Sequence, residues 1–229
     1  MIKKIKVQPD SRTSKILFFQ EADLEQFSCP RRVIPLFGPN GAGKSTLIKN
    51  LADKDEIKCE MDPGIKTKYY SYINSRDNFK TREPRSYEEA FDIMFMRRKW
   101  DAGTLSEGQS ILYSVLDLLD GLKNGDIPAE DGIDYTIILD EIDSGLSIDN
   151  IDMVMKKIRT LVNKRTDVQI IFSFNNPRVL KHFNHALSMY DGKQIQLENE
   201  EDMARVIREH KQSFDHVRKK SNGRPKVFE

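Results

Sequence analysis

The sequence predicts an α/β fold whose β-sheet is mixed but mainly parallel. Through the middle of the chain, apolar runs of strand length alternate with segments of helical periodicity, which is typical of parallel sheets covered by helices. A glycine-rich turn also stands directly between one such apolar run and a helical segment. The 229 residues, 38% hydrophobic and 32% charged, suffice for a solvated globular protein with a sizeable core.

The first third of the chain is expected to supply short strands and one helix. Residues 2–7, 15–19 and 33–37 are expected to form short strands. Residues 44–54 follow the glycine-rich turn and are expected to form a helix. Residues 56–73, rich in aromatic side chains, contain one or two further strands.

Two amphipathic helices are expected next. The first begins at Ser86, which forms a capping box with Glu89. Its apolar face consists of Tyr87, Ala90, Phe91, Met94 and Phe95. The second helix is expected to start after residue 109. Its apolar face consists of Ile111, Leu112, Val115, Leu118, Leu119 and Leu122.

The second half of the chain continues the alternation of strands and helices. A loop rich in glycine and acidic residues is expected at 121–134. The elements after it are a strand at 135–139, a helix at 148–164, a strand at 168–174, a short helix after Pro177, a hairpin at 186–197, a helix at 199–220 and a tail at 221–229.

Composition excludes several classes of protein. Two cysteines, Cys29 and Cys59, do not make a disulfide framework, so a reducing cytoplasmic location is expected. The first ten residues have no long apolar core and do not resemble a signal peptide. No run approaches the roughly 20 apolar residues of a membrane helix, so membrane insertion is not expected. The net charge of +1 argues neither for nor against nucleic acid.

The glycine-rich turn has the pattern G-x-x-x-x-G-K-[ST] between a predicted strand and a predicted helix. Its residues, expected to bind the phosphates of a nucleotide, are Gly38, Pro39, Asn40, Gly41, Ala42, Gly43, Lys44, Ser45 and Thr46. Glycines let successive backbone N–H groups turn toward an anion, and the following helix adds its positive N-terminal end. Lys44 would contact the β- and γ-phosphates, and the Ser45 hydroxyl would bind Mg²⁺.

Two carboxylates follow the apolar strand at 135–139. In a parallel sheet, the end of this strand lies at the same edge as the phosphate loop. Asp140 is therefore expected to hold Mg²⁺ through water, and Glu141 to accept a proton from the attacking water. A second anion-binding device is expected at residues 104–110, just before a helix. There the Ser106 hydroxyl and the N–H groups around Gly108 can contact phosphate.

Together, "GPNGAGKST", "LSEGQ" and "ILDEIDSGLSID" resemble the ordered motifs of ATP-binding cassette (ABC-type) ATPases, over roughly residues 33–195. The resemblance implies a P-loop NTPase fold in one domain, 1–229, with an N-terminal antiparallel β portion. It also implies a short helical signature subdomain at about 75–120, and the C-terminal helix and tail would occupy about 200–229.

The resemblance further implies a head-to-tail dimer, of this chain or with a related ATPase subunit, that sandwiches two molecules of ATP. Ser106 and Gly108 would then contact the γ-phosphate bound by Lys44 of the partner subunit. Residues 144–149 resemble the D-loop, which crosses the dimer interface in that family.

The sequence departs from transporter cassettes at several positions. Asn175 stands where those proteins have a histidine, so it is expected to contact the γ-phosphate and to act with Glu141. His182 and His185 are expected on the surface of the following helix. Asn74 stands near the usual glutamine, and Phe18 and Phe19 are candidates to stack on adenine, although a core role is favoured.

These departures, and the short stretch between Lys44 and Ser106, resemble the soluble branch of the superfamily, which includes chromosome-maintenance, recombination-repair and phage-defence ATPases. The expected function is a slow ATPase whose ATP-dependent dimerisation acts on a partner protein or on DNA. Basic clusters at 97–99 and 218–220 are the candidate DNA contacts. Two alternatives remain: the nucleotide-binding subunit of a transporter, and an ATP sensor with little turnover.

Overall fold

The computed structural model describes residues 1–7, 26–29, 31–51, 57–61, 66–72, 107–126, 128–190 and 192–196, together with single positions between 201 and 215. Several predictions lie outside the described residues. These are the strand at 15–19 with Phe18 and Phe19, Asn74, the helix from Ser86 with the basic cluster at 97–99, Ser106, and the tail with the cluster at 218–220.

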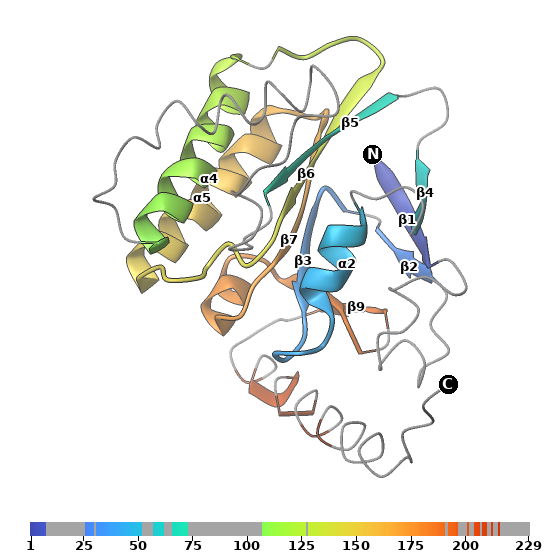
Figure 1. The fold of residues 1–229 in the computed structure, drawn as a ribbon, viewed down its shortest axis with the longest axis vertical. Helices are drawn as coiled ribbons and strands as arrows, with labels where there is room; N and C mark the ends of the chain where they lie inside the picture. The colour runs from blue at the N-terminus through green and yellow to red at the C-terminus, as the bar shows by residue number, and fades with distance from the viewer. Residues whose placement is uncertain are drawn as a thin grey trace, which may run out of the picture.

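The main sheet has six strands in the order β5-β6-β7-β3-β8-β9 (Figure 1). Their bounds are Val33–Phe37 (β3), Lys66–Tyr72 (β5), Ile133–Leu139 (β6), Val168–Ser173 (β7), His185–Ser188 (β8) and Gln194–Gln196 (β9). All neighbours pair in parallel except β8 and β9, which form the expected antiparallel hairpin. The prediction of a mixed, mainly parallel sheet is confirmed.

A second sheet of three antiparallel strands has the order β2-β1-β4. Its strands are Ile2–Val7 (β1), Gln26–Ser28 (β2) and Ile57–Met61 (β4). The expected N-terminal antiparallel portion is therefore present. Buried Gln169 joins the two sheets, because its side-chain amide bonds both the N–H and the C=O of Ile2 at 2.9 Å.

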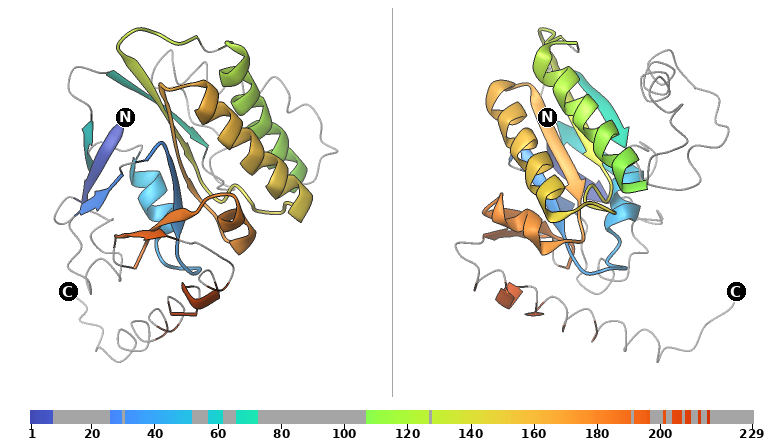
Figure 2. Two further views of the ribbon diagram at one scale, coloured as in Figure 1. Left: turned by 180° about the vertical axis from the view of Figure 1, so that it is seen from behind. Right: turned by 90° about the vertical axis from the view of Figure 1, so that its left-hand side faces the viewer.

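Helices cover both faces of the main sheet (Figures 1 and 2). Helices α4 (Glu107–Asn124) and α5 (Ile148–Lys164) lie side by side on one face, and α2 (Lys44–Leu51) lies on the other. The strands alternate accordingly. In β6, Ile137 and Leu139 pack toward α4 and α5, whereas Ile138 between them packs with α2. A strand buried on both faces explains why β6 and β7 are continuous apolar runs.

Helix boundaries match the sequence best where capping is local. Helix α5 spans the predicted 148–164, and the Ser147 side chain accepts the Asn150 N–H at its start. Two predictions were wrong. Helix α4 begins at Glu107 rather than after residue 109, and it continues through Gly121 to Asn124, so the loop at 121–134 is shorter than predicted. The helix continues because Leu122 is fully buried, and that burial outweighs the low helix propensity of Gly121.

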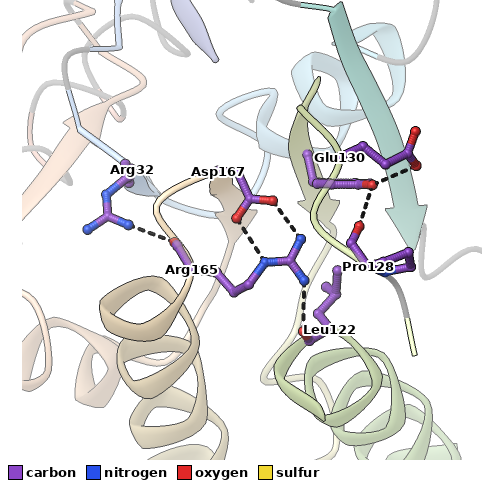
Figure 3. A network of polar contacts seen from close by, with 7 residues as sticks. Arg32, Leu122, Pro128, Glu130, Arg165 and Asp167 are labelled. Atoms are coloured by element: carbon purple, nitrogen blue, oxygen red, sulfur yellow. Dashed lines mark hydrogen bonds and ion pairs between the residues drawn. The ribbon is translucent and has the colours of Figure 1, made fainter. Parts of the chain in front are cut away.

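The amino ends of β6 and β7 are held by a network of polar side chains (Figure 3). Arg165, at the end of α5, donates to both carboxylate oxygens of Asp167, at 2.8 and 2.6 Å, and to the Leu122 carbonyl at 3.0 Å. Its guanidinium lies 5.4 Å from the ring centre of Tyr135. Arg32 donates to the Arg165 carbonyl at 2.8 Å, so this network also joins the start of β3 to the end of α5.

Candidate functional site

The phosphate loop connects β3 to α2 in the predicted strand–loop–helix order. Gly41 and Gly43 have φ values of 83° and 88°, a region that side-chain-bearing residues rarely adopt. Gly38 is required for space, because a Cβ there would lie 3.0 Å from the Cβ atoms of both Ala42 and Met189. The glycines of the motif are therefore explained by the backbone path of the loop.

Lys44 opens α2, and only 5% of it is exposed. Its ammonium donates to the carbonyl oxygens of Gly38 at 2.7 Å and Pro39 at 3.2 Å. Burial lowers the pKa of Lys44, and the nearby acids Glu141, Asp143 and Asp140, in decreasing order, partly oppose that shift. The cation thus lies within the loop that would hold phosphate, where the added negative charge would stabilise it.

Two acids follow β6 at the same edge of the sheet. Asp140 is buried, and its Oδ1 accepts the Ser173 hydroxyl at 2.6 Å. Glu141 is partly exposed, and its N–H donates to the same hydroxyl oxygen at 2.7 Å. Glu141 has a φ of 48° and is the only non-glycine residue in the described part of the chain with a positive φ. Strained backbone of this kind is often found at functional sites.

Asn175 lies two residues beyond β7, and β7 separates β6 from the phosphate-loop strand β3. This strand order places Asn175 between the two motifs. Its exposed side-chain amide donates to Glu141 Oε1 at 3.4 Å. The structure thus brings together Asn175 and Glu141, which the sequence analysis had paired only through a family resemblance.

Sequence reasoning missed two further residues at this edge, Ser173 and Asp143. Ser173 is fully buried at the end of β7 and bonds both acids that follow β6. The carboxylate of Asp143 accepts the backbone N–H groups of Asn175, at 2.9 and 3.1 Å to its two oxygens, and of Asn176. The available signals were a hydroxyl inside an apolar strand and a third acid, two residues after "DE".

Magnesium would be held by few protein ligands. In the described part of the chain, no group of three or more His, Cys, Asp or Glu side chains is placed to hold a metal ion. Mg²⁺ often keeps several waters and binds through one or two protein oxygens together with substrate phosphates. Partly buried Ser45 in the first turn of α2 and the buried carboxylate of Asp140 fit that requirement.

A family model described as an AAA domain matches residues 30–183, which is more than half of the chain. This match spans the phosphate loop, the acids after β6 and Asn175. The chain belongs to the AAA domain family. Together with the sheet order, the match establishes a P-loop fold of the ATP-binding type for this AAA-domain protein.

Solved structures similar to this AAA-domain protein include ABC transporter cassettes. The dimeric bacterial cassette MJ0796 is 16% identical, with 77% of this chain and 91% of that chain covered and a TM-score of 0.46. The ADP conformation of the cassette MJ1267 is 20% identical, with 93% and 96% covered and a TM-score of 0.47. No curated protein matched the chain. None of the described helices has the length and apolar character needed to cross a membrane.

The signature segment of the AAA-domain protein is described only from Glu107 onward. Gly108 is the second residue of α4, within the first turn, where backbone N–H groups have no partners inside the helix. Helix α4 leads through a short loop into the start of β6, so its N-terminus lies at the carboxyl end of the sheet with the phosphate loop (Figure 1). Ser106 lies outside the described residues.

The prediction that both histidines lie on the surface was wrong. His185 is buried on β8, where its Nε2 lies 2.8 Å from the Val33 carbonyl, and burial lowers its pKa. His182 ends the short 3₁₀ helix Pro177–Lys181 (η1), and its Nε2 lies 2.7 Å from Asp152 Oδ1. The helix expected after Pro177 ends early, so the chain returns to the sheet at His185. Neither histidine contacts Glu141.

Proposed function

We propose that this protein binds ATP and hydrolyses it slowly with Mg²⁺, and that head-to-tail dimerisation around ATP lets it act as a soluble switch on a partner protein or DNA. The observation that carries the proposal is the contact between Asn175 and Glu141 beside the buried ammonium of Lys44. A candidate base, a neutral hydrogen-bond donor and a phosphate-binding cation therefore share one edge of the sheet.

The residues divide the chemistry among themselves. Lys44 would exchange its carbonyl partners Gly38 and Pro39 for phosphate oxygens, which are stronger partners for an ammonium. Bound Mg²⁺, held by Ser45 and through water by Asp140, would supply charge stabilisation at the phosphates. Glu141, the most exposed of the three acids at this edge, would take the proton of the attacking water.

Slow turnover follows from the chemistry of Asn175. Its amide can donate a hydrogen bond to Glu141 or to a phosphate oxygen, but it cannot take up a proton and carry positive charge. The proposed turnover number is therefore below about 1 s⁻¹, the lower end of the common enzyme range. A long-lived ATP-bound state suits a switch, because a partner has time to bind it.

Dimerisation is proposed from the placement of α4. Its first turn, with Gly108, lies at the carboxyl end of the sheet, and the resemblance makes it the contact for ATP bound by the partner subunit. The preceding Ser106 would add its hydroxyl to that contact. A bulky cation at position 106 would then prevent the two subunits from closing.

The decisive test is Glu141→Gln. Removing a positioned base lowers the rate by about 10²–10⁴, while the neutral amide keeps the shape and ATP still binds. Steady-state phosphate release should fall by that factor, and light scattering with Mg-ATP should show a dimer. Adding Ser106→Arg should return the variant to a monomer.

Glu130→Gln is the matched control. Glu130 lies in the loop before β6, where its carboxylate accepts the Tyr135 hydroxyl at 3.0 Å, and a glutamine oxygen can accept the same bond. Phosphate release by this variant should equal that of the wild type. A Glu141→Gln protein that hydrolyses ATP at the wild-type rate would refute the assignment of the base. One that stays monomeric with ATP at high concentration would refute the dimer.

A further inference from the structure

Two buried polar side chains connect the ends of β6 and β7 in opposite directions. Ser173, the last residue of β7, reaches across to Asp140 and Glu141, which follow β6. Asp143, in the turn after β6, reaches across to the backbone of Asn175 and Asn176, which follow β7. The candidate base and its amide partner are thus each held from the opposite strand.

The bonds of Ser173 fix the direction of its hydroxyl. A hydroxyl has one proton and two acceptor positions. Asp140, as a carboxylate, can only accept, so the hydroxyl proton points to Asp140 Oδ1 at 2.6 Å, and the hydroxyl oxygen accepts the Glu141 N–H at 2.7 Å. Ser173 is 0% exposed and Asp140 only 2%, so water does not readily replace either bond.

Ser173 bonds Glu141, the residue of the site with a strained backbone. Glu141 has a φ of 48°, and such a conformation persists only where the surroundings hold it. The Ser173 hydroxyl accepts the Glu141 N–H and so holds the backbone in this conformation. With the backbone in this conformation, Glu141 Oε1 accepts a hydrogen bond from the Asn175 side-chain amide at 3.4 Å.

Asp143 holds the backbone of Asn175 by hydrogen bonds. The aspartate is 7% exposed, and its two oxygens accept the Asn175 N–H at 3.1 and 2.9 Å and the Asn176 N–H as well. A carboxylate that faces only donors cannot be replaced by an amide without turning an NH₂ group toward an N–H. The position of the chain after β7 therefore depends on the two acceptor oxygens of the Asp143 side chain.

We propose that Ser173 and Asp143 are positioning residues for hydrolysis: Ser173 sets the backbone of Glu141, and Asp143 sets the backbone of Asn175. The proposal rests on the proposed function, in which Glu141 is the base. Ser173 bonds Glu141 and Asp140, and Asp143 bonds Asn175 and Asn176, so each side chain acts through the residues that it bonds. Each should affect turnover and leave ATP affinity in place.

The test compares Ser173→Ala and Asp143→Asn with Thr136→Val. Thr136 is also fully buried, and its hydroxyl bonds Gln169 Oε1 at 3.4 Å between the same two strands, away from the site. Ser173→Ala should lower kcat by about 10- to 100-fold, as expected when a reacting group is displaced by about 1 Å. Asp143→Asn should lower it by up to about fivefold, the loss expected when the Asn175 amide loses its contact with Glu141. ATP affinity should stay within about twofold for all three proteins, and Thr136→Val should keep the wild-type kcat.

A double-variant measurement separates positioning from a general loss of structure. In the Glu141→Gln background, Ser173→Ala should lower residual hydrolysis by a much smaller factor than in the wild type, because residues that act as one unit are strongly non-additive. The same fold-loss in both backgrounds would overturn the proposal. So would a wild-type kcat in Ser173→Ala.

The outcomes also separate this proposal from the proposed function. If Glu141→Gln hydrolyses ATP normally, both fail. If Glu141→Gln is inactive while Ser173→Ala and Asp143→Asn are fully active, only the positioning roles fail.

Amide hydrogen exchange of the wild type tests the hydrogen bonds themselves, even if a variant does not fold. The N–H groups of Glu141, Asn175 and Asn176 should exchange slowly, since each donates to a buried acceptor. Exchange as fast as in an exposed loop would mean that these bonds are absent, and would overturn the proposal. In folded Ser173→Ala, exchange of the Glu141 N–H should accelerate while that of Asn176 stays slow.

Discussion

The two ends of the main sheet both contain buried or largely buried charges, but the charges are partnered differently. At the amino end, Arg165 and Asp167 form a two-bond ion pair, and a third guanidinium N–H bonds the Leu122 carbonyl (Figure 3). At the carboxyl end, the partners of Lys44 among the described residues are two backbone carbonyls, and Asp140 bonds a hydroxyl. No ion pair joins Lys44 to either Asp140 or Asp143 within the described residues.

This difference separates a stabilising cluster from a binding site. Burying a charge costs free energy unless it is paired and hydrogen-bonded. The amino-end pair satisfies that condition within the chain, so it stabilises the fold without a ligand. The ammonium of Lys44 at the carboxyl end is hydrogen-bonded but has no ion-pair partner in the described structure, and a bound phosphate would supply one. Substitutions at the two ends should therefore have opposite effects on stability and on ATP binding.

The largest effect is expected for Lys44→Ala. It removes the charge that offsets the β- and γ-phosphates, and hydrogen bonds to charged groups are worth about 1.5–3 kcal/mol each. ATP affinity should fall more than about 100-fold, measured by equilibrium binding of a fluorescent ATP analogue. Lys44→Met, which keeps most of the buried stem, should lose binding while its free energy of unfolding stays equal or rises. Unchanged affinity in either variant would disprove the phosphate-loop assignment.

Arg165→Met should show the reverse pattern. It leaves the largely buried carboxylate of Asp167 without its partner, which costs about 3 kcal/mol in the free energy of unfolding. ATP affinity should match that of the wild type. Denaturant unfolding and nucleotide titration on the same samples measure both quantities. Weakened ATP binding in a folded Arg165→Met protein would show that the two ends are coupled.

The same pair predicts a pH dependence. The hydrogen bonds from Arg165 hold the pKa of Asp167 below its ordinary value. The resulting stability is fully present above about pH 4, the ordinary range of an aspartate, and is lost as the pH falls through the lowered pKa of the folded protein. The difference in unfolding free energy between wild type and Arg165→Met should therefore shrink below about pH 4. A constant difference down to pH 2 would contradict this.

A smaller effect is expected for Asn175→Ala. The lost hydrogen bond is exposed and 3.4 Å long, so about 1 kcal/mol, or roughly fivefold in kcat, is expected with little change in ATP affinity. Asn175→His should raise kcat. Asn176→Ala is the control: its side chain accepts the Arg178 N–H at 2.9 Å and caps η1, so it should cost stability but no activity. If Asn175→Ala releases phosphate as fast as wild type, Asn175 does not replace the histidine of transporter cassettes.

The smallest effect concerns alkaline pH. Because burial lowers the pKa of Lys44, its ammonium loses its proton at a lower pH than an exposed lysine does. Phosphates bind the charged form, so ATP affinity should be constant near pH 7 and fall as the pH rises through the lowered pKa, by about twofold where pH equals that pKa. Binding isotherms between pH 7 and 10 measure the fall. Constant affinity up to the range of an ordinary lysine would contradict it.

Much of the fold was predictable from local pattern. The strand at 33–37, the helix at 148–164 and the hairpin at 186–197 each have a complete local signal in periodicity, capping or turn residues. The errors fell where burial outweighed propensity. Helix α4 continues through Gly121. His185 is buried because it lies on β8, where its ring packs against that of Phe183, with ring centres 6.4 Å apart.

The phosphate loop follows from the sequence alone, since the positive φ angles of Gly41 and Gly43 and the close approach of Gly38 to Ala42 all lie within a nine-residue segment. The sequence also determined that two acids follow a buried strand. That β7 lies between β6 and β3 does not follow from any local pattern, because it depends on pairing among segments distant in the sequence. This strand order brings the Asn175 side chain to Glu141 and makes Ser173 and Asp143 part of the site. Hydrogen bonds between residues about 30 positions apart depend on which strands pair, so no local pattern predicts them.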